Sequence, residues 1–265
     1  MARPAKVILF DLDGTIYLDG VLYPGVRALV RRLQASSLAF GFLTNNSSVG
    51  PGAYVRRLRA SGLEIGRRHV LTSAEATCRM LAELRLGPEL YVLGTRALRR
   101  FLAGRGYPHS YERARAVLVG FDTELTYRKL AEATRLLLAR GLPLVASHPD
   151  PVCPATWPDA GMLLACLQAA GPQIRAAAIA GKPHRWIVEL AQQRFGCAPD
   201  EMIMVGDRVD TDVRFARQYG MRSILVLNGA PRPTPAAARA AGADAIADTI
   251  AEVADRYWPP DLGWV

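Results

Sequence analysis

Lysine is scarce in this chain of 265 residues, which nevertheless carries 33 basic residues and a net charge of +9. It occurs only as Lys6, Lys129 and Lys182, so nearly all of the positive charge comes from arginine. The arginines are spread along predicted helix faces and are not concentrated with aromatic residues. This distribution favours solvated helix surfaces over a surface that binds nucleic acid.

Cysteines and long apolar runs are also few. The four cysteines show no CxxC spacing and no histidine at zinc-ligand spacing, which argues against a disulfide framework and a zinc site. No run approaches the roughly 20 apolar residues that span a bilayer. The apolar stretch Val7–Phe10 is too short for the core of a signal peptide. We therefore expect a cytoplasmic protein with reduced thiols that binds neither membrane nor nucleic acid.

The most informative segment is residues 7–16, in which an apolar run ends in two aspartates and a glycine. Alternation along an extended strand places Asp11 and Asp13 on the same side of the backbone. Ligands of open α/β sheets bind beyond the carboxyl ends of the strands, so this acid pair is placed for chemistry. One carboxylate can attack while the other handles a proton, and a hard divalent cation can relieve their repulsion.

Three later apolar runs also end in polar residues. They lead into Thr44-Asn45-Asn46 after residues 39–43, Gly181-Lys182-Pro183 after residues 176–180, and a loop with Asp207 and Asp212 after residues 202–205. Hydroxyl, amide and backbone groups donate hydrogen bonds to an anion, and lysine adds a cation. The four strand ends together hold the groups that bind phosphate and magnesium.

These motifs resemble those of the haloacid dehalogenase (HAD) superfamily of phosphotransferases: DxDGT, a Thr or Ser after the second strand, a Lys, and GDxxxxD. They occur in that order over nearly the whole chain. The strings LFDLDGTIYLDG, FLTNNSS, GKP and MVGDRVDTD are similar to the nitrophenylphosphatase type of subfamily IIA. Members of this type carry a type II (C2) cap between the second and third motifs.

Strand and helix patterns alternate throughout the chain, which is typical of parallel sheets covered by helices. With the resemblance, they predict an α/β fold: a Rossmann-like parallel-sheet core with an inserted α/β C2 cap. We expect residues 1–80 to form the first part of the core and residues 81–175 the cap. Residues 176–265 form the second part, which begins with the strand leading into Lys182.

The resemblance also assigns catalytic roles. Asp11 is the expected nucleophile, and Asp13 is the expected general acid and base. The expected Mg²⁺ ligands are Asp11, the backbone carbonyl of Asp13, and Asp207. Asp212, one helical turn further on, would orient Lys182 or a water on the metal.

Binding of the phosphate group is expected from the loops after the first three motif strands. The expected groups are Gly14, Thr44, Asn45, Asn46 and Lys182, with Lys182 offsetting negative charge that develops during transfer.

Substrate choice is expected to depend on the cap. Residues 146–151 resemble the substrate-facing loop of the subfamily, in which Asn usually precedes a Pro-Asp pair. His148 replaces that Asn here, and we take His148 and Asp150 as specificity candidates. Val49 is a second departure, because a basic or polar residue is expected after the two serines.

The expected function is Mg²⁺-dependent hydrolysis of small phosphomonoesters such as sugar phosphates, nucleoside monophosphates, pyridoxal phosphate or nitrophenyl phosphate. Two alternatives remain open. One is a catalytically weak protein of the same fold that binds a phosphorylated metabolite, and the other is a phosphomutase or a phosphonate-cleaving relative. The resemblance also allows a homodimer through the cap, and it leaves the natural substrate open.

Overall fold

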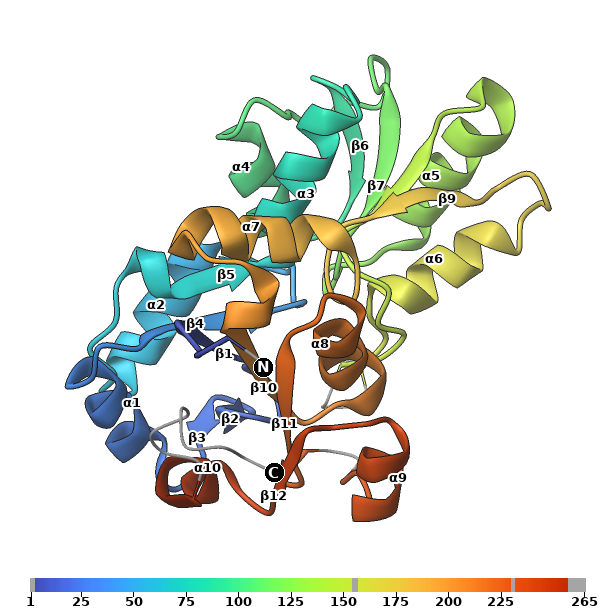
Figure 1. Cartoon of the computed structure of the whole chain (residues 1–265). Coiled ribbons are helices and arrows are strands. Elements are labelled where there is room, and N and C mark those ends of the chain that lie inside the picture. Colours follow the sequence, from blue (N-terminus) through green and yellow to red (C-terminus); the bar gives the residue numbers. More distant parts are fainter. Residues whose placement is uncertain (1–2, 154–156, 230–231, 257–265) are drawn as a thin grey trace. The chain divides into compact units, whose positions relative to one another are not determined.

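The computed structural model describes residues 3–153, 157–229 and 232–256 (Figure 1), and its contacts divide the chain into two compact units. Unit 1 comprises Met1–Thr44, Tyr54–Leu71 and Val188–Val265, and unit 2 comprises Asn45–Ala53 and Thr72–Ile187. The chain therefore leaves unit 1 twice, once briefly and once for a long insertion.

Unit 1 is built on a six-stranded sheet with the order β12-β11-β10-β1-β4-β5. Its strands are β1 (Val7–Phe10), β4 (Ala39–Thr44), β5 (Val70–Thr72), β10 (Met202–Gly206), β11 (Arg222–Val226) and β12 (Ala245–Ala247). Strand β1 pairs in parallel with both β10 and β4. Its four side chains are all buried, as expected for a central strand covered on both faces.

Helices accompany this sheet in the order that the alternating pattern predicts. They are α1 (Val26–Gln34), α2 (Pro51–Ala60), α7 (Arg185–Phe195), α8 (Arg214–Gln218), α9 (Pro235–Ala240) and α10 (Ile250–Arg256). Helix α1 is typical: Val26, Leu29, Val30 and Leu33 recur at helical spacing and are buried. The short antiparallel pair β2 (Tyr17–Leu18) and β3 (Val21–Leu22) follows β1.

The order of the strands reverses at β1. The chain continues from β1 to β4 and β5 on one side, whereas β10, β11 and β12 lie on the other. The amide of Asp11, directly after β1, donates a hydrogen bond of 2.8 Å to the carbonyl oxygen of Val205 in β10. In open α/β sheets, ligands bind outside the carboxyl ends of the strands at the point where the strand order reverses.

Unit 2 contains a four-stranded sheet with the order β6-β7-β8-β9, in which all pairs are parallel. Its strands are β6 (Leu90–Leu93), β7 (Ala116–Val119), β8 (Leu144–Ala146) and β9 (Ala176–Ile179). Its helices are α3 (Ser73–Glu83), α4 (Arg96–Ala103), α5 (Tyr127–Arg140) and α6 (Ala160–Gln168). Helices α5 and α6 pack against each other and on the sheet, around Val117, Leu136 and Leu164.

The pairing of β9 corrects one expectation. The strand leading into Lys182 was expected to open the second part of the core, but it pairs with β8 and belongs to the sheet of unit 2. An apolar run indicates a buried strand, yet it does not indicate which of two parallel sheets the strand joins. The assignment of residues 81–175 to a cap domain stays a prediction.

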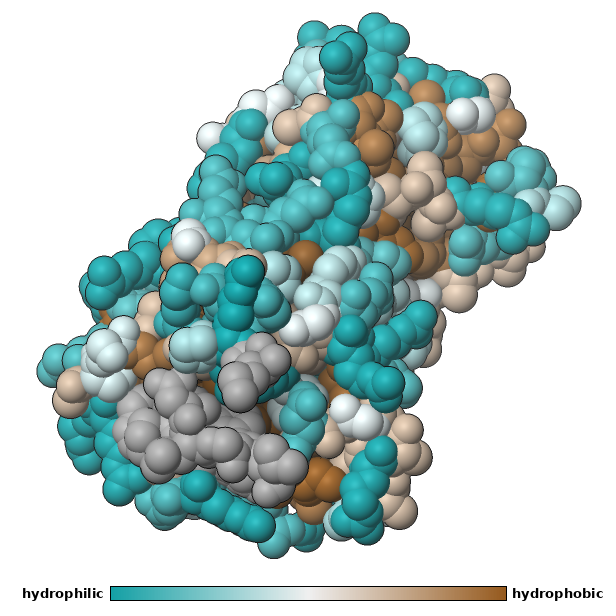
Figure 2. All heavy atoms as spheres, in the orientation of Figure 1, coloured by the Kyte–Doolittle hydropathy of each residue, from teal (hydrophilic) through white to brown (hydrophobic). Residues whose placement is uncertain are grey.

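Large exposed hydrophobic side chains are concentrated in unit 2. Figure 2 shows hydrophilic residues over most of the face in view, with hydrophobic ones gathered around the elements of unit 2. Those that are more than a third exposed there are Leu84, Leu125, Tyr127, Leu138, Trp157 and Met162. Within residues 3–153, 157–229 and 232–256, no helix has the length and apolar character needed to cross a bilayer.

Candidate active site

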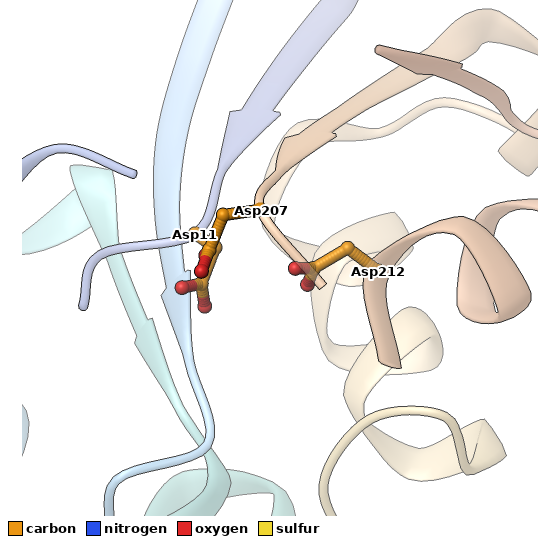
Figure 3. A group of neighbouring side chains, drawn as sticks. All are labelled: Asp11, Asp207 and Asp212. Atoms are coloured by element: carbon orange, nitrogen blue, oxygen red, sulfur yellow. The ribbon is translucent and has the colours of Figure 1, made fainter. Parts of the chain in front are cut away.

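Three buried carboxylates meet at the carboxyl ends of β1 and β10. Asp11 follows β1, Asp207 follows β10, and Asp212 lies five residues further on (Figure 3). One carboxylate oxygen from each lies within 4.8 Å of the others, and their exposed fractions are 7%, 3% and 1%. Hard carboxylate oxygens at this spacing can hold a divalent cation, which would relieve their repulsion.

Glycines let the backbone pack closely against two of these carboxylates, those of Asp207 and Asp212. A Cβ atom at Gly14 or Gly229 would collide with the Asp207 carboxylate, and one at Gly206 would collide with that of Asp212. Gly14 also has a φ of +92°, which favours glycine over any other residue. The backbone can therefore approach the carboxylates as closely as the site requires. The three oxygen donors fit a hard cation.

A short π-helix places Asp212. It covers Val209–Val213 and precedes α8. The Oδ2 atom of Asp212 accepts a hydrogen bond of 3.1 Å from the amide of Arg208, which holds the carboxylate over Gly206. Such turns often occur at functional sites because the extra residue redirects a side chain. Its role was expected to be that of an orienting residue, and the structure brings it together with the two expected ligands.

Thr15 and Asn228 tie the neighbouring loops to this group. The Thr15 hydroxyl donates to Oδ1 of Asp207 at 2.9 Å, and the Asn228 amide donates to the carbonyl oxygen of Gly14 at 3.1 Å. Asn228 follows β11, so a further strand end contributes to the site. The Asn228 Oδ1 atom is buried and has no hydrogen-bond partner among the described residues.

The Asp13 side chain has a different environment. Its Oδ2 atom accepts a hydrogen bond of 3.3 Å from the hydroxyl of Tyr17. Burial raises the pKa of Tyr17 well above its usual value, and the Asp13 carboxylate raises it further. The Tyr17 phenol therefore stays protonated and donates to Asp13. The Arg57 guanidinium acts in the opposite direction and lowers the pKa of Tyr17, but by less than burial raises it.

In unit 2, the expected lysine is held by its backbone. Lys182 is only 2% exposed, and its amide donates to Oδ1 of Asn45 at 2.8 Å. The Asn45 amide group donates back to the carbonyl oxygen of Lys182 at 3.0 Å and to Oδ2 of Asp150 at 2.8 Å. The Asn45 side chain is thus hydrogen-bonded to both the amide and the carbonyl group of Lys182, and Asp150 fixes the orientation of Asn45.

His148 is the clearest difference from the sequence-based expectation. It was expected to face the substrate, but its side chain is fully buried in unit 2. Its Nδ1 atom lies 2.8 Å from Oγ of Ser147, and its Nε2 atom lies 2.7 Å from Oδ1 of Asp159. Both ring nitrogens are bonded within the protein, so the ring is not placed to contact a substrate. The pattern of loop residues could not reveal this, because the partner Asp159 follows eleven positions later.

The remaining expected binding residues lie at the ends of strands or in turns. Thr44 is the last residue of β4 and is 2% exposed. The Asn46 Oδ1 atom accepts hydrogen bonds from both the amide and the hydroxyl of Ser48, so its side chain stabilises its own turn. The expected residues therefore fall into two groups. Asp11, Asp13, Gly14, Thr44, Asp207 and Asp212 belong to unit 1, and Asn45, Asn46, His148, Asp150 and Lys182 belong to unit 2.

Several supporting residues escaped the sequence analysis, namely Thr15, Tyr17, Arg57, Asn228, Ser47, Ser147 and Asp159. Thr15 stands inside the DxDGT string and Asp159 precedes an apolar helix, so the signals for these two were present. Arg57 acts on Tyr17, and Asn228 donates to Gly14, which is 214 positions away in the chain. Only the fold brings these residues to their partners.

Comparisons with known proteins identify the family of this chain. A family model described as haloacid dehalogenase-like hydrolase matches residues 8–108, and a second HAD-like hydrolase model matches residues 179–253. Glycerol-3-phosphate phosphatase of Gallus gallus is 35% identical over 250 residues, covering 84% of this chain and 79% of the relative.

Solved structures show the same fold. The 4-nitrophenylphosphatase of Thermotoga maritima matches with a TM-score of 0.87 and 35% identity, over 95% of this chain and 97% of that one. A glycerol phosphate phosphatase of Mycobacterium tuberculosis, in complex with calcium, matches with a TM-score of 0.80 and 27% identity, over 94% of this chain and 74% of that one.

Fold, buried carboxylates and relatives together show that the chain belongs to the haloacid dehalogenase-like hydrolases. Within that family it is a phosphatase of the NagD and nitrophenylphosphatase type.

Proposed function

We propose that this phosphatase hydrolyses small phosphomonoesters with the help of Mg²⁺, through a phosphorylated aspartate at Asp11. The observation that carries the proposal is the group of Asp11, Asp207 and Asp212, whose carboxylates converge in a buried site at the strand reversal. Three converging carboxylates repel one another, a bound cation relieves that repulsion, and oxygen-only donors suit a hard cation.

Magnesium is the cation we propose, held by Asp11, the backbone carbonyl of Asp13, and Asp207, with Asp212 beside them. The calcium complex of the mycobacterial relative supports binding of a hard divalent ion in this family. When bound, Mg²⁺ supplies positive charge that offsets the charge of the phosphate group and of the carboxylates.

The chain's own residues perform the transfer as follows. A carboxylate oxygen of Asp11 forms a bond to phosphorus while the ester oxygen leaves and takes a proton from Asp13. Water then attacks the same phosphorus and gives a proton to Asp13, which restores the Asp11 carboxylate and releases phosphate. The Tyr17 hydroxyl donates to Oδ2 of Asp13 and so orients the carboxyl group that exchanges this proton.

Phosphate binding is assigned to Gly14, Thr44, Asn45, Asn46 and Lys182. Phosphoryl transfer depends mostly on positioning and charge stabilisation, so hydroxyl and amide donors with one fixed cation are sufficient. The substrate remains a class: small phosphorylated metabolites, among which the names of the relatives make glycerol 3-phosphate the first choice. Asp150 is the remaining candidate for a specificity residue in unit 2.

The test is phosphate release from a panel of glycerol 3-phosphate, nitrophenyl phosphate, sugar phosphates, nucleoside monophosphates and pyridoxal phosphate, with and without Mg²⁺. Asp11→Asn removes the attacking carboxylate and should abolish release in the folded protein. Asp210→Asn is the matched control, because Asp210 is exposed in the same acidic loop as Asp207. If Asp11→Asn still released phosphate, the assignment of Asp11 as the nucleophile would be rejected. Tight binding of the panel without release by the parent protein would favour the binding-protein alternative, and transfer of phosphate within a substrate would favour a mutase.

We also propose that the protein works in the cytoplasm and that two copies pair through unit 2. Four free cysteines support a reducing compartment, and the exposed hydrophobic side chains of unit 2 support pairing. Light scattering after size-exclusion chromatography measures the pairing. A monomer at micromolar concentration would reject it.

A further inference from the structure

A chain of buried polar side chains in unit 2 lies beside the lysine loop and has no role in the proposed reaction steps. Ser47, Ser147 and His148 are completely buried, and Asp159 is 3% exposed. The Ser47 and Ser147 hydroxyl oxygens are 2.9 Å apart, and the His148 ring connects Ser147 to Asp159 with contacts of 2.8 and 2.7 Å. Buried polar groups linked in this way hold each other rigidly, provided that each donor finds an acceptor.

The donors in this chain can be ordered. The Ser47 hydroxyl oxygen accepts a hydrogen bond of 2.9 Å from the amide of Phe121, so its own hydrogen is available for Ser147. The Ser147 hydroxyl then donates to Nδ1 of His148, and Nε2–H of His148 donates to Asp159. A neutral imidazole with its hydrogen on Nε2 satisfies every member. The Asp159 carboxylate also accepts from the amide of Ala160 at 2.6 Å.

His148 is packed directly against the loop that carries Lys182. The Gly181 amide donates to the carbonyl oxygen of Ser147 at 2.7 Å. A Cβ atom on Gly181 would lie 2.9 Å from Cβ of His148, so the two backbones touch at this point. A displacement of His148 therefore moves the residue before Lys182.

A second connection runs through Asp150. The Gly161 amide donates to the carbonyl oxygen of Asp150 at 2.8 Å, next to the helix start that Asp159 caps. Asp150 holds the amide of Asn45, and Asn45 holds both backbone groups of Lys182. Both connections thus lead from the contact between His148 and Asp159 to the backbone of Lys182.

We propose that His148 and Asp159 are positioning residues that fix the Lys182 loop for phosphoryl transfer. The pair acts through Lys182 and therefore rests on the charge-stabilising role proposed for that residue. This role also accounts for the departure from the subfamily pattern at position 148. A histidine reaches both Ser147 and Asp159, whereas the shorter asparagine side chain cannot span the same two partners.

A double-mutant cycle tests the proposal with nitrophenyl phosphate and Mg²⁺. His148→Leu replaces the ring with an apolar side chain of similar size and removes the contacts with Ser147 and Asp159. It should lower kcat about 10- to 100-fold, because small misplacements of catalytic groups have effects of this size. In a Lys182→Ala background the same change should alter kcat less than about twofold, because the group it positions is gone. Equal losses in both backgrounds, or none in either, overturn the proposal.

A second set of variants covers the case in which His148→Leu does not fold. Asp159→Ser keeps an oxygen for the helix start but cannot reach His148, and it should reproduce the loss of kcat. Asp159→Asn can still accept from both His148 and Ala160, and it should retain most of the activity. Equal activity of Asp159→Ser and Asp159→Asn would contradict the proposal.

Lys129→Met is the matched control for general damage to unit 2. It breaks a partly buried ion pair elsewhere in unit 2, in which Lys129 Nζ lies 2.8 Å from Oδ2 of Asp122. This variant should lose stability and keep kcat. A loss of kcat as large as that of His148→Leu would mean that any weakening of unit 2 has the same effect, and would overturn the proposal.

Hydrogen exchange provides a readout that needs no activity. The Lys182 amide, bonded to Asn45, should exchange at least about tenfold faster in His148→Leu and unchanged in Lys129→Met. If the parent protein releases no phosphate, the proposed function fails, and this exchange still decides whether His148 holds the lysine loop. Unchanged exchange overturns the positioning role even if the parent is an active phosphatase.

Discussion

The Thr15 hydroxyl donates a hydrogen bond of 2.9 Å to Oδ1 of Asp207 and so joins the loop after β1 to the loop after β10. The two residues are 192 positions apart in the chain, and both are buried. Because Asp207 belongs to the carboxylate group, this contact connects the stability of the core to the shape of the site.

Thr15→Val should therefore lower both the stability of the fold and the affinity of the carboxylate group for Mg²⁺. The substitution keeps the shape and removes the donor to a buried carboxylate, which should lower the free energy of unfolding by about 2 kcal/mol. It should also weaken Mg²⁺ binding, because Asp207 loses its fixed orientation. Denaturant unfolding and a Mg²⁺ titration measure the two effects. Thr15→Ser keeps the hydroxyl and serves as the control, and equal behaviour of the two variants would contradict the interpretation.

Gly14→Ala should abolish phosphatase activity by pushing a methyl group into the Asp207 carboxylate. Gly20→Ala is a close control for the backbone, because Gly20 has a similar φ of +82° but no atom within 4 Å of the added carbon. Both variants place an alanine in the left-handed region of backbone space, which costs about 1–2 kcal/mol. Only Gly14→Ala should lose activity. A parallel loss in Gly20→Ala would show that strain alone is responsible.

Mg²⁺ should raise the melting temperature of the protein. Binding to the folded state at 100 times the dissociation constant stabilises it by about 2.7 kcal/mol. Asp212→Asn should reduce the shift, because it removes one of the three converging carboxylates. Calorimetry with and without Mg²⁺ measures this. A parent protein whose melting temperature is the same in EDTA and in Mg²⁺ would argue against a cation in the carboxylate group.

His109 predicts how stability changes with pH. Burial, together with Arg99, lowers its pKa to about 4, and its Nδ1 atom accepts a hydrogen bond of 3.0 Å from the amide of Val92. Because the folded pKa lies below the unfolded value of about 6.5, the unfolded state binds the proton more readily. This contribution to stability is present above pH 6.5 and is lost as the pH falls toward 4.

His109→Asn should flatten that dependence. The amide oxygen of asparagine can still accept from Val92 but does not titrate between pH 4 and pH 7. The difference in unfolding free energy between pH 7 and pH 4.5 should therefore be smaller in the variant than in the parent. Parallel stability curves for the two proteins would refute the role of His109.

The ends of the strands could be predicted from the sequence because each combines two local signals. A run such as Val7–Phe10 is apolar without interruption, which indicates a strand buried on both faces, and it stops at charged residues that cannot be buried without partners. The same reasoning located Thr44, Lys182 and Asp207. The end of helix α5 could also be predicted, because the helix stops before Gly141, a glycine whose φ is +58°.

Partners across the chain could not be predicted in this way. The sequence around His148 indicates a polar loop residue, whereas its burial depends on Asp159, Ser147 and Ser47 being brought around it. Likewise, nothing near β9 indicates that it pairs with β8 and not with the core sheet.

By itself, the sequence determined which residue types stand at the strand ends, and hence a parallel α/β fold with carboxylates, hydroxyl, amides and lysine for phosphate chemistry. Only the tertiary structure decided that Asp212 lies beside Asp11 and Asp207, that Tyr17 donates a hydrogen bond to Asp13, and that His148 is buried inside unit 2. The reason is physical. Periodicity reports which side of a local element is buried, whereas a hydrogen bond between distant residues depends on where several elements pack at once.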